Sequence, residues 1–221
     1  MGAKDKACPR RPPHAGLRGR VSCDAPHPPR RRATGSTMAL KATVVRAELQ
    51  LSDLDRHHYA TYPLTLAQHP SETEERLMVR LLAFALHADE RLEFGRGLSD
   101  EDEPALWRRD YGGEIEQWIE LGHPDESRVK KACARAREVV VVNYGGRASD
   151  LWWEKAAGTL SRLKNLTVLA LPADVPAQLA AMGSRGMRLN ALVQDGELQL
   201  MGDAGTLAIR PEVRIAAGGA R

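Results

Sequence analysis

The sequence predicts a mixed α/β domain in which a partly parallel sheet is flanked by helices. Three observations indicate this class. β-like and helical segments alternate along the chain, two runs rich in β-branched residues each follow a helical segment, and Asp195-Gly196 marks a β-hairpin. Strands separated by a helix usually pair in parallel, whereas a two-residue turn joins antiparallel strands. We therefore expect one mixed sheet in one domain.

The expected elements begin with a strand hairpin and a long helix, and end with helix–strand units and a second hairpin. The expected strands cover residues 40–50, 57–66, 114–121, 139–143, 167–171, 187–194, 197–201 and 207–213, residues 91–99 are extended, and the expected helices cover residues 71–86, 125–137, 152–164 and 175–182. Ser71 and Glu74 have the spacing of a capping box, so Ser71 is expected to cap the first helix. The broad apolar face of the helix at 71–86 predicts that this helix is deeply buried.

The first 37 residues differ in composition from the rest of the chain. They contain nine of the Lys and Arg residues, two Asp and six of the 13 prolines, whereas the remainder is mildly acidic with a net charge of −4. Such a segment buries too little apolar surface to offset its chain entropy, so we expect residues 1–37 to be a disordered basic tail and residues 38–221 to be the domain. A nucleic-acid-binding arm is the alternative, and Met38 is an alternative start of the protein.

Several classes of protein are excluded. The sequence has no run of 18 apolar residues, no dinucleotide-binding, Walker or nucleophile-elbow motif, and no metal-type spacing of Cys and His. Its tail lacks the apolar stretch of a secretory signal. We therefore expect a cytoplasmic protein without a membrane partner, and the sequence leaves its oligomeric state open.

Acidic residues and one lysine are the main candidates for chemistry. Asp102 lies in an acidic turn, Glu120 lies near the end of an expected strand, and Lys131 follows on the next helix. Carboxylates at neighbouring strand ends can hold Mg²⁺, which prefers oxygen ligands. Such an ion activates water for attack on a phosphate, and a nearby lysine stabilises the negative charge that develops. Solvated acidic side chains without a ligand are the competing interpretation.

Two further sets of side chains extend this hypothesis. Arg128, Lys131 and Arg135 have the i, i+3, i+7 spacing of one helical face, and a basic stripe of this kind can bind phosphates. In the first helix, Glu72 is favoured by the helix dipole, and Glu75 has no evident structural duty. A solvated helix face is the alternative for both sets.

Long and unusual strings of the sequence resemble one known family. They lie at residues 38–43, 69–73, 78–88, 91–94, 102–104, 118–122, 131–133 and 152–154. On these strings, residues 38 to about 214 resemble the YaeQ family of bacterial proteins. The resemblance implies a variant of the PD-(D/E)XK nuclease fold, in which a helix glutamate, a strand aspartate and a Glu-x-Lys strand surround a divalent metal ion.

The resemblance also implies roles for particular residues. Glu75 or Glu72 would be the helix acid, and Asp102 and Glu120 would be metal ligands for Mg²⁺. Gly122 stands where the lysine of the Glu-x-Lys pattern belongs, and Lys131 would replace that lysine from the following helix. Two functions follow as hypotheses: a metal-dependent nuclease or phosphodiesterase acting on nucleic acid, or a non-catalytic regulatory or nucleic-acid-associated protein that retains the fold.

Overall fold

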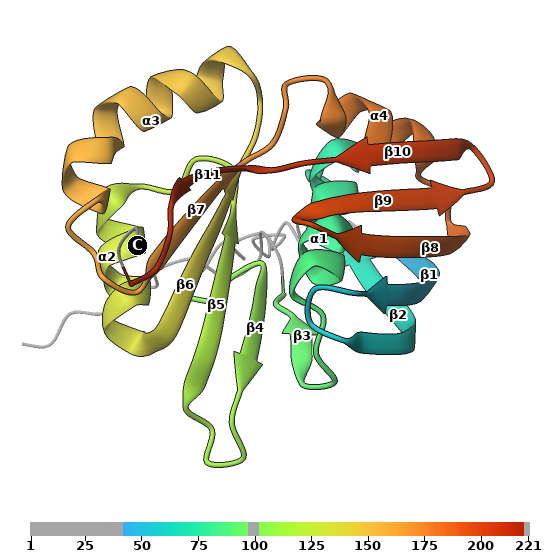
Figure 1. The fold of residues 1–221 in the computed structure, drawn as a ribbon, viewed down its shortest axis with the longest axis horizontal. Helices are drawn as coiled ribbons and strands as arrows, with labels where there is room; N and C mark the ends of the chain where they lie inside the picture. The colour runs from blue at the N-terminus through green and yellow to red at the C-terminus, as the bar shows by residue number, and fades with distance from the viewer. Residues whose placement is uncertain (1–41, 97–101, 219–221) are drawn as a thin grey trace, which may run out of the picture. The chain divides into compact units, whose positions relative to one another are not determined.

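The computed structural model describes residues 42–96 and 102–218, which form two mixed β-sheets and four helices (Figure 1). The strands are β1 (Thr43–Asp53), β2 (His58–Gln68), β3 (Leu92–Phe94), β4 (Leu106–Arg109), β5 (Ile115–Leu121), β6 (Ala136–Asn143), β7 (Leu166–Ala170), β8 (Gly186–Gln194), β9 (Glu197–Gly202), β10 (Gly205–Ile209) and β11 (Glu212–Ile215). The helices are α1 (Glu74–His87), α2 (Glu126–Arg135), α3 (Arg147–Leu160) and α4 (Val175–Met182). The predicted mixed α/β class with flanking helices is confirmed.

The first sheet has the strand order β10-β9-β8-β1-β2. Strands β1 and β8 run parallel, and the other neighbours in this sheet are antiparallel. Asp195 and Gly196 join β8 to β9 with positive φ angles of 53° and 72°. This backbone conformation is the one that an Asp-Gly turn favours, so the predicted second hairpin is confirmed.

The second sheet has the strand order β11-β7-β6-β5-β4-β3. Strands β5, β6 and β7 run parallel, because α2 and α3 connect them in turn, and β3 and β4 add an antiparallel edge. The expectation of one sheet was wrong. The expected strand at 207–213 is interrupted at Pro211, which has no N–H to donate, so β10 joins the first sheet and β11 joins the second.

Helix α1 packs between the two sheets. Its nine residues from Leu77 to Ala85 are all buried, and they share one core with side chains of both sheets. The helix begins later than the sequence predicted. Thr73, not Ser71, is the N-cap, and its hydroxyl accepts a hydrogen bond of 3.2 Å from the Arg76 N–H.

A second, smaller core covers the other face of the second sheet. Side chains of β5, β6 and β7 pack there against α2 and α3. Alternation along β5 divides the two cores: Trp118 belongs to the core below α2, whereas Ile119 and Leu121 belong to the core that contains α1. The position of a residue in β5 therefore decides whether its side chain lies on the α1 side or on the α2 side of the sheet.

Two expectations concern parts of the chain beyond this core. The basic tail at 1–37 lies outside the described residues. Among the helices that the structure describes, none combines the length and the apolar character needed to cross a bilayer.

The burial of His87, the last residue of α1, leads to the prediction that acid destabilises the fold. Its Nε2 atom is buried without a hydrogen-bond partner among the described residues. Burial, aided by the positive charges of Arg56 and Arg108, lowers the pKa of His87 to about 4. Because an unfolded histidine titrates near about 6.5, the free energy of unfolding should decrease as pH falls from about 6.5 to about 4, by at most about 1.4 kcal/mol per pH unit.

Urea denaturation across this pH range measures the effect. The variant His87→Gln should lose this part of the pH dependence, whereas His123→Gln, which changes an exposed histidine, should keep it. An unchanged pH profile for His87→Gln would contradict the prediction.

Candidate functional site

Helix α2 packs on the second sheet and carries the three predicted basic residues beside its packed face. Val129 and Ala132 are 0% and 1% exposed and pack against the second sheet. At about 100° per residue, Arg128, Lys131 and Arg135 border that packed face and do not lie opposite it. The predicted burial of the apolar face is confirmed, whereas two of the basic side chains reach inward: Arg128 pairs with the buried Glu120, and Arg135 lies over the ring of the buried Trp118.

Lys131 reaches the first predicted carboxylate. Its Nζ atom lies 2.5 Å from Oδ1 of Asp102, which precedes β4. The hydrogen bond and the charge of Lys131 hold the pKa of Asp102 below its usual range, and the nearby Arg135 and Arg128 act in the same direction. Both members of the pair are more than half exposed, so the pair adds little to the stability of the fold.

Glu120 lies beside this pair but is almost fully buried. Its side chain is on the α2 face of β5, two residues after Trp118. The Glu120 Oε1 atom accepts hydrogen bonds from Trp118 Nε1 at 2.7 Å and from Arg128 Nε at 2.8 Å. Arg128 also donates through Nη2 to the main-chain oxygen of Glu103, again at 2.8 Å. Arg128 therefore ties the strand end to the segment that carries Asp102.

Five of the seven predicted site residues thus lie together, with Trp118 as a sixth member. Arg135 completes the group, because its guanidinium carbon lies 5.2 Å from the centre of the Trp118 ring. We call this group the α2 cluster; its members are Asp102, Trp118, Glu120, Arg128, Lys131 and Arg135.

The two predicted helix acids lie elsewhere. Glu72 and Glu75 are at the start of α1, which packs on the other face of the second sheet from α2. Glu72 is buried and faces Arg80 at 3.4 Å and Arg76 at 3.9 Å, whereas Glu75 is exposed. The structure therefore does not bring a helix acid to Asp102 and Glu120, because strand alternation directs Glu120 to the opposite side of β5. Catalytic roles for Glu72 and Glu75 stay predictions.

In the structure, both predicted magnesium ligands are paired with cationic side chains, and the magnesium site stays a prediction. Asp102 and Glu120 supply the oxygen ligands that Mg²⁺ prefers, but their carboxylates already face Lys131 and Arg128. Within residues 42–96 and 102–218, no three His, Cys, Asp or Glu side chains are grouped so as to hold a metal ion. The exposed donors of the α2 cluster are those of Lys131 and Arg135, whereas Arg128 is held by Glu120 and by the Glu103 carbonyl.

Sequence reasoning missed the part that tryptophan plays in this site. Alternation within 114–121 places Trp118 and Glu120 on one face, but the indole hydrogen bond to the carboxylate was not expected. The neighbouring strand β4 was not predicted either, so its Trp107, which pairs with Trp118 in the sheet register, was overlooked. The sequence signal for β4 was the string Leu106-Trp107-Arg108-Arg109, in which apolar and polar residues do not clearly alternate.

Comparison with known proteins decides the family. A family model described as YaeQ protein matches residues 38–211. The chain belongs to the YaeQ family. It is 46% identical to the YaeQ protein of Escherichia coli (strain K12) over 172 residues, which are 78% of this chain and 95% of the relative. It is 47% identical to the YaeQ protein of Salmonella typhi over 173 residues, 78% of this chain and 96% of the relative.

Solved YaeQ structures share the fold. The crystal structure of the YaeQ protein from Xanthomonas axonopodis pv. citri matches with a TM-score of 0.77 and 60% identity, over 79% of this chain and 99% of that one. The Pseudomonas syringae YaeQ structure matches with a TM-score of 0.77 and 37% identity, over 80% of this chain and 98% of that one. The family resemblance found in the sequence is confirmed.

The buried pair of Glu72 and Arg80 leads to a prediction about stability in this YaeQ-family chain. Arg80 is 1% exposed, and its removal would leave the Glu72 carboxylate buried, with Arg76 at 3.9 Å as its remaining ion-pair partner among the described residues. Arg80→Met should therefore lower the free energy of unfolding by about 3 kcal/mol or more. The double variant Glu72→Gln/Arg80→Met should recover part of that loss, because no uncompensated charge then remains buried.

Denaturant unfolding of the unchanged protein, Glu72→Gln, Arg80→Met and the double variant measures the coupling free energy between the two side chains. The exposed pair of Lys130 and Glu126 provides the control, and Lys130→Met should cost less than about 0.5 kcal/mol. A loss for Arg80→Met no greater than that for Lys130→Met would refute a structural role for the buried pair.

Proposed function

We propose that this YaeQ-family protein is a nucleic-acid-associated protein with a nuclease-like fold, which contacts phosphate groups through the α2 cluster and does not cleave its ligand. The observation that carries this proposal is the state of the two predicted metal ligands. Each carboxylate faces a positively charged side chain, Asp102 facing Lys131 and Glu120 facing Arg128. The cluster is therefore organised around cations, which suits an anionic ligand.

The order of elements supports the nuclease-like comparison. The chain passes from α1 through the antiparallel strands β3, β4 and β5 to α2, and then to β6, which is parallel to β5. A helix that begins with acids, Asp102 just before β4 and Glu120 on β5 follow in the order that the resemblance implies. Fold likeness alone does not establish catalysis, so the site has to carry the function.

The electrostatics of the α2 cluster support phosphate contact at its exposed side. Lys131 is 59% exposed and its partner Asp102 is 71% exposed, so their ion pair is weak in water and exchanges readily for a phosphate oxygen. Arg135 is exposed as well and has the planar donors that suit phosphate. Arg128 differs, because its bonds to Glu120 and to the Glu103 carbonyl tie it to the fold.

A metal-dependent nuclease or phosphodiesterase is the second candidate. The observation that favours it is the convergence of Asp102, Glu120 and Lys131 from three separate segments of the chain. Under this alternative, Arg128 and Lys131 would release the two carboxylates when Mg²⁺ binds. Lys131, which is not a metal ligand, would then stabilise negative charge on the attacked phosphate.

One set of assays separates the two candidates. The full chain is mixed with fluorescently labelled DNA and RNA, and both binding and cleavage are followed with Mg²⁺, with Mn²⁺ and with EDTA. We expect binding that persists in EDTA and weakens several-fold in Lys131→Ala, with no cleavage under any condition. Because Lys131→Ala removes one phosphate contact, it should also reduce the salt dependence of binding, by about 0.7 to 0.9 in the slope of log K against log salt.

Lys130→Ala is the matched control, because Lys130 is the next residue of α2 and pairs with Glu126 instead. It should bind as the unchanged protein does. Metal-dependent cleavage that Lys131→Ala abolishes and Lys130→Ala keeps would establish the nuclease and overturn the non-catalytic proposal.

A further inference from the structure

Three arginine–aromatic contacts gather on the hairpin formed by β4 and β5. The guanidinium carbon of Arg109 lies 4.4 Å from the centre of the Trp107 ring, and that of Arg91 lies 5.5 Å from the Tyr111 ring. The third contact joins Arg135 to Trp118 within the α2 cluster. Arginine side chains therefore lie beside aromatic rings on β4, on β5 and in the turn between them.

Two of these contacts, those at Trp107 and Trp118, meet ring to ring, and the one at Tyr111 is linked to them through the main chain, because Arg91 Nη1 donates to the Arg109 carbonyl oxygen at 3.2 Å. Trp107 and Trp118 are partners in the β4–β5 register, and their rings meet edge to face at 6.2 Å. Helix α2 covers Trp118, which is 3% exposed, but Trp107 lies one strand further out and is only partly buried. Arg109 is 44% exposed, and its acidic partner Glu93 is 61% exposed. A phosphate can replace this weak surface pair.

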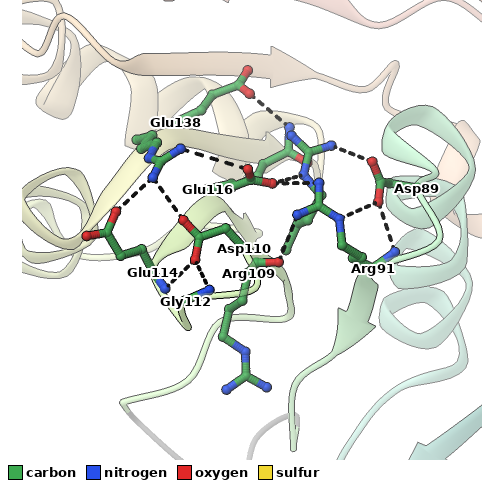
Figure 2. Close-up of polar contacts among 11 residues, drawn as sticks. Asp89, Arg91, Arg109, Asp110, Gly112, Glu114, Glu116 and Glu138 are labelled. Carbon is green, nitrogen blue, oxygen red and sulfur yellow. Dashed lines mark hydrogen bonds and ion pairs between the residues drawn. The ribbon is translucent and has the colours of Figure 1, made fainter.

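Tyr111 is presented to solvent on a well-fixed turn. It is 98% exposed, more than any other large hydrophobic side chain among the described residues. Tyr111 belongs to the turn between β4 and β5. Figure 2 shows how this turn is held: the Asp110 carboxylate accepts hydrogen bonds from the N–H groups of Gly112 and Glu114 at 2.8 and 3.0 Å. Arg137 holds the same carboxylate at 2.9 Å. Apart from the contact with Arg91, so exposed a ring adds little to the core, so its position suits contact with a partner.

Single-stranded nucleic acid is the partner whose chemistry fits this arrangement. Unpaired bases stack on tyrosine, tryptophan and arginine planes, while basic side chains follow the backbone. In a duplex the faces of the bases are already stacked on one another. The net charge of −4 beyond residue 37 makes charge alone a weak basis for this domain to bind either form, so stacking has to supply the preference.

We propose that single-stranded DNA or RNA lies along the β4–β5 hairpin and enters the α2 cluster. Bases stack at Trp107 with Arg109 and at Tyr111, and backbone phosphates contact Arg135 and Lys131. This inference rests on the proposed function, since it names the form of nucleic acid that the same surface takes.

The test is fluorescence anisotropy of the full chain with a labelled 20-nucleotide oligothymidylate and with a labelled duplex of the same length. We expect the single strand to bind at least tenfold more tightly than the duplex. Tyr111→Ala should weaken single-strand binding by roughly fivefold or more, which is the range measured for base–aromatic stacking, and Tyr111→Phe should restore it. Tyr59→Ala is the matched control, because Tyr59 is 63% exposed on β2, in the other sheet, and should bind normally.

A second variant tests the stacking site on β4. Trp107→Leu keeps an apolar side chain on β4 but removes the large ring, and it should weaken single-strand binding by roughly fivefold or more. Tyr111→Ala changes an exposed side chain and should leave the fold intact, so its result stands even where Trp107→Leu reduces stability.

The outcomes distinguish this inference from the function on which it rests. Equal binding of single strand and duplex, or binding that Tyr111→Ala and Trp107→Leu both leave unchanged while Lys131→Ala weakens it, would overturn the single-strand inference and retain the proposed function. Failure of every oligonucleotide to bind would overturn both.

Discussion

The burial of α1 between two sheets is the constraint on which the rest of the structure depends. Nine consecutive residues of this helix are buried, so no side of it over that stretch faces water. One sheet covers part of its circumference and the second sheet covers another, and side chains of both belong to one core. Each sheet needs the helix to bury its inner face, and this is why a chain of alternating strands and helices forms two sheets.

The same burial requires Arg80 to be compensated. A guanidinium that is 1% exposed is costly unless charge and hydrogen bonds offset it. Glu72 supplies the charge at 3.4 Å, the Ala67 carbonyl accepts a hydrogen bond at 3.0 Å, and the Phe94 ring lies 5.7 Å from the guanidinium carbon. These contacts link the helix to β2 and β3. They also give Glu72 a structural duty, which explains an acid at the start of α1 without assigning it to catalysis.

Charge pairing is a general feature of the second sheet. In Figure 2, Asp89, Glu116 and Glu138 lie among arginines and a glutamine from neighbouring elements. The α2 cluster follows the same rule, but its pairs differ in burial. The Glu120–Arg128 pair is largely closed off and fixes geometry, whereas Lys131 and Arg135 remain open to solvent. Binding chemistry therefore belongs to the exposed cations of α2, and the buried pair positions them.

Elements whose pattern is local could be predicted from the amino-acid sequence. The Asp195-Gly196 turn, the long buried helix, the β-branched strand β6 and the buried face of α2 all follow from spacing and turn chemistry within short segments. The helix cap did not follow in the same way, because Ser71 and Thr73 are both good cap residues and only the path of the chain selected Thr73.

Tertiary structure decided what depends on distant parts of the chain. The sequence identified Asp102, Glu120 and Lys131 as neighbours, and strand β5 and helix α2 do bring them together. It did not show that Arg128 would pair with the Glu120 carboxylate. Nor did it show that Glu72 would lie on the other side of the sheet from Glu120. The physical reason is that alternation along β5 sends adjacent side chains to opposite faces. Which helix covers each face is fixed by packing and not by any local pattern.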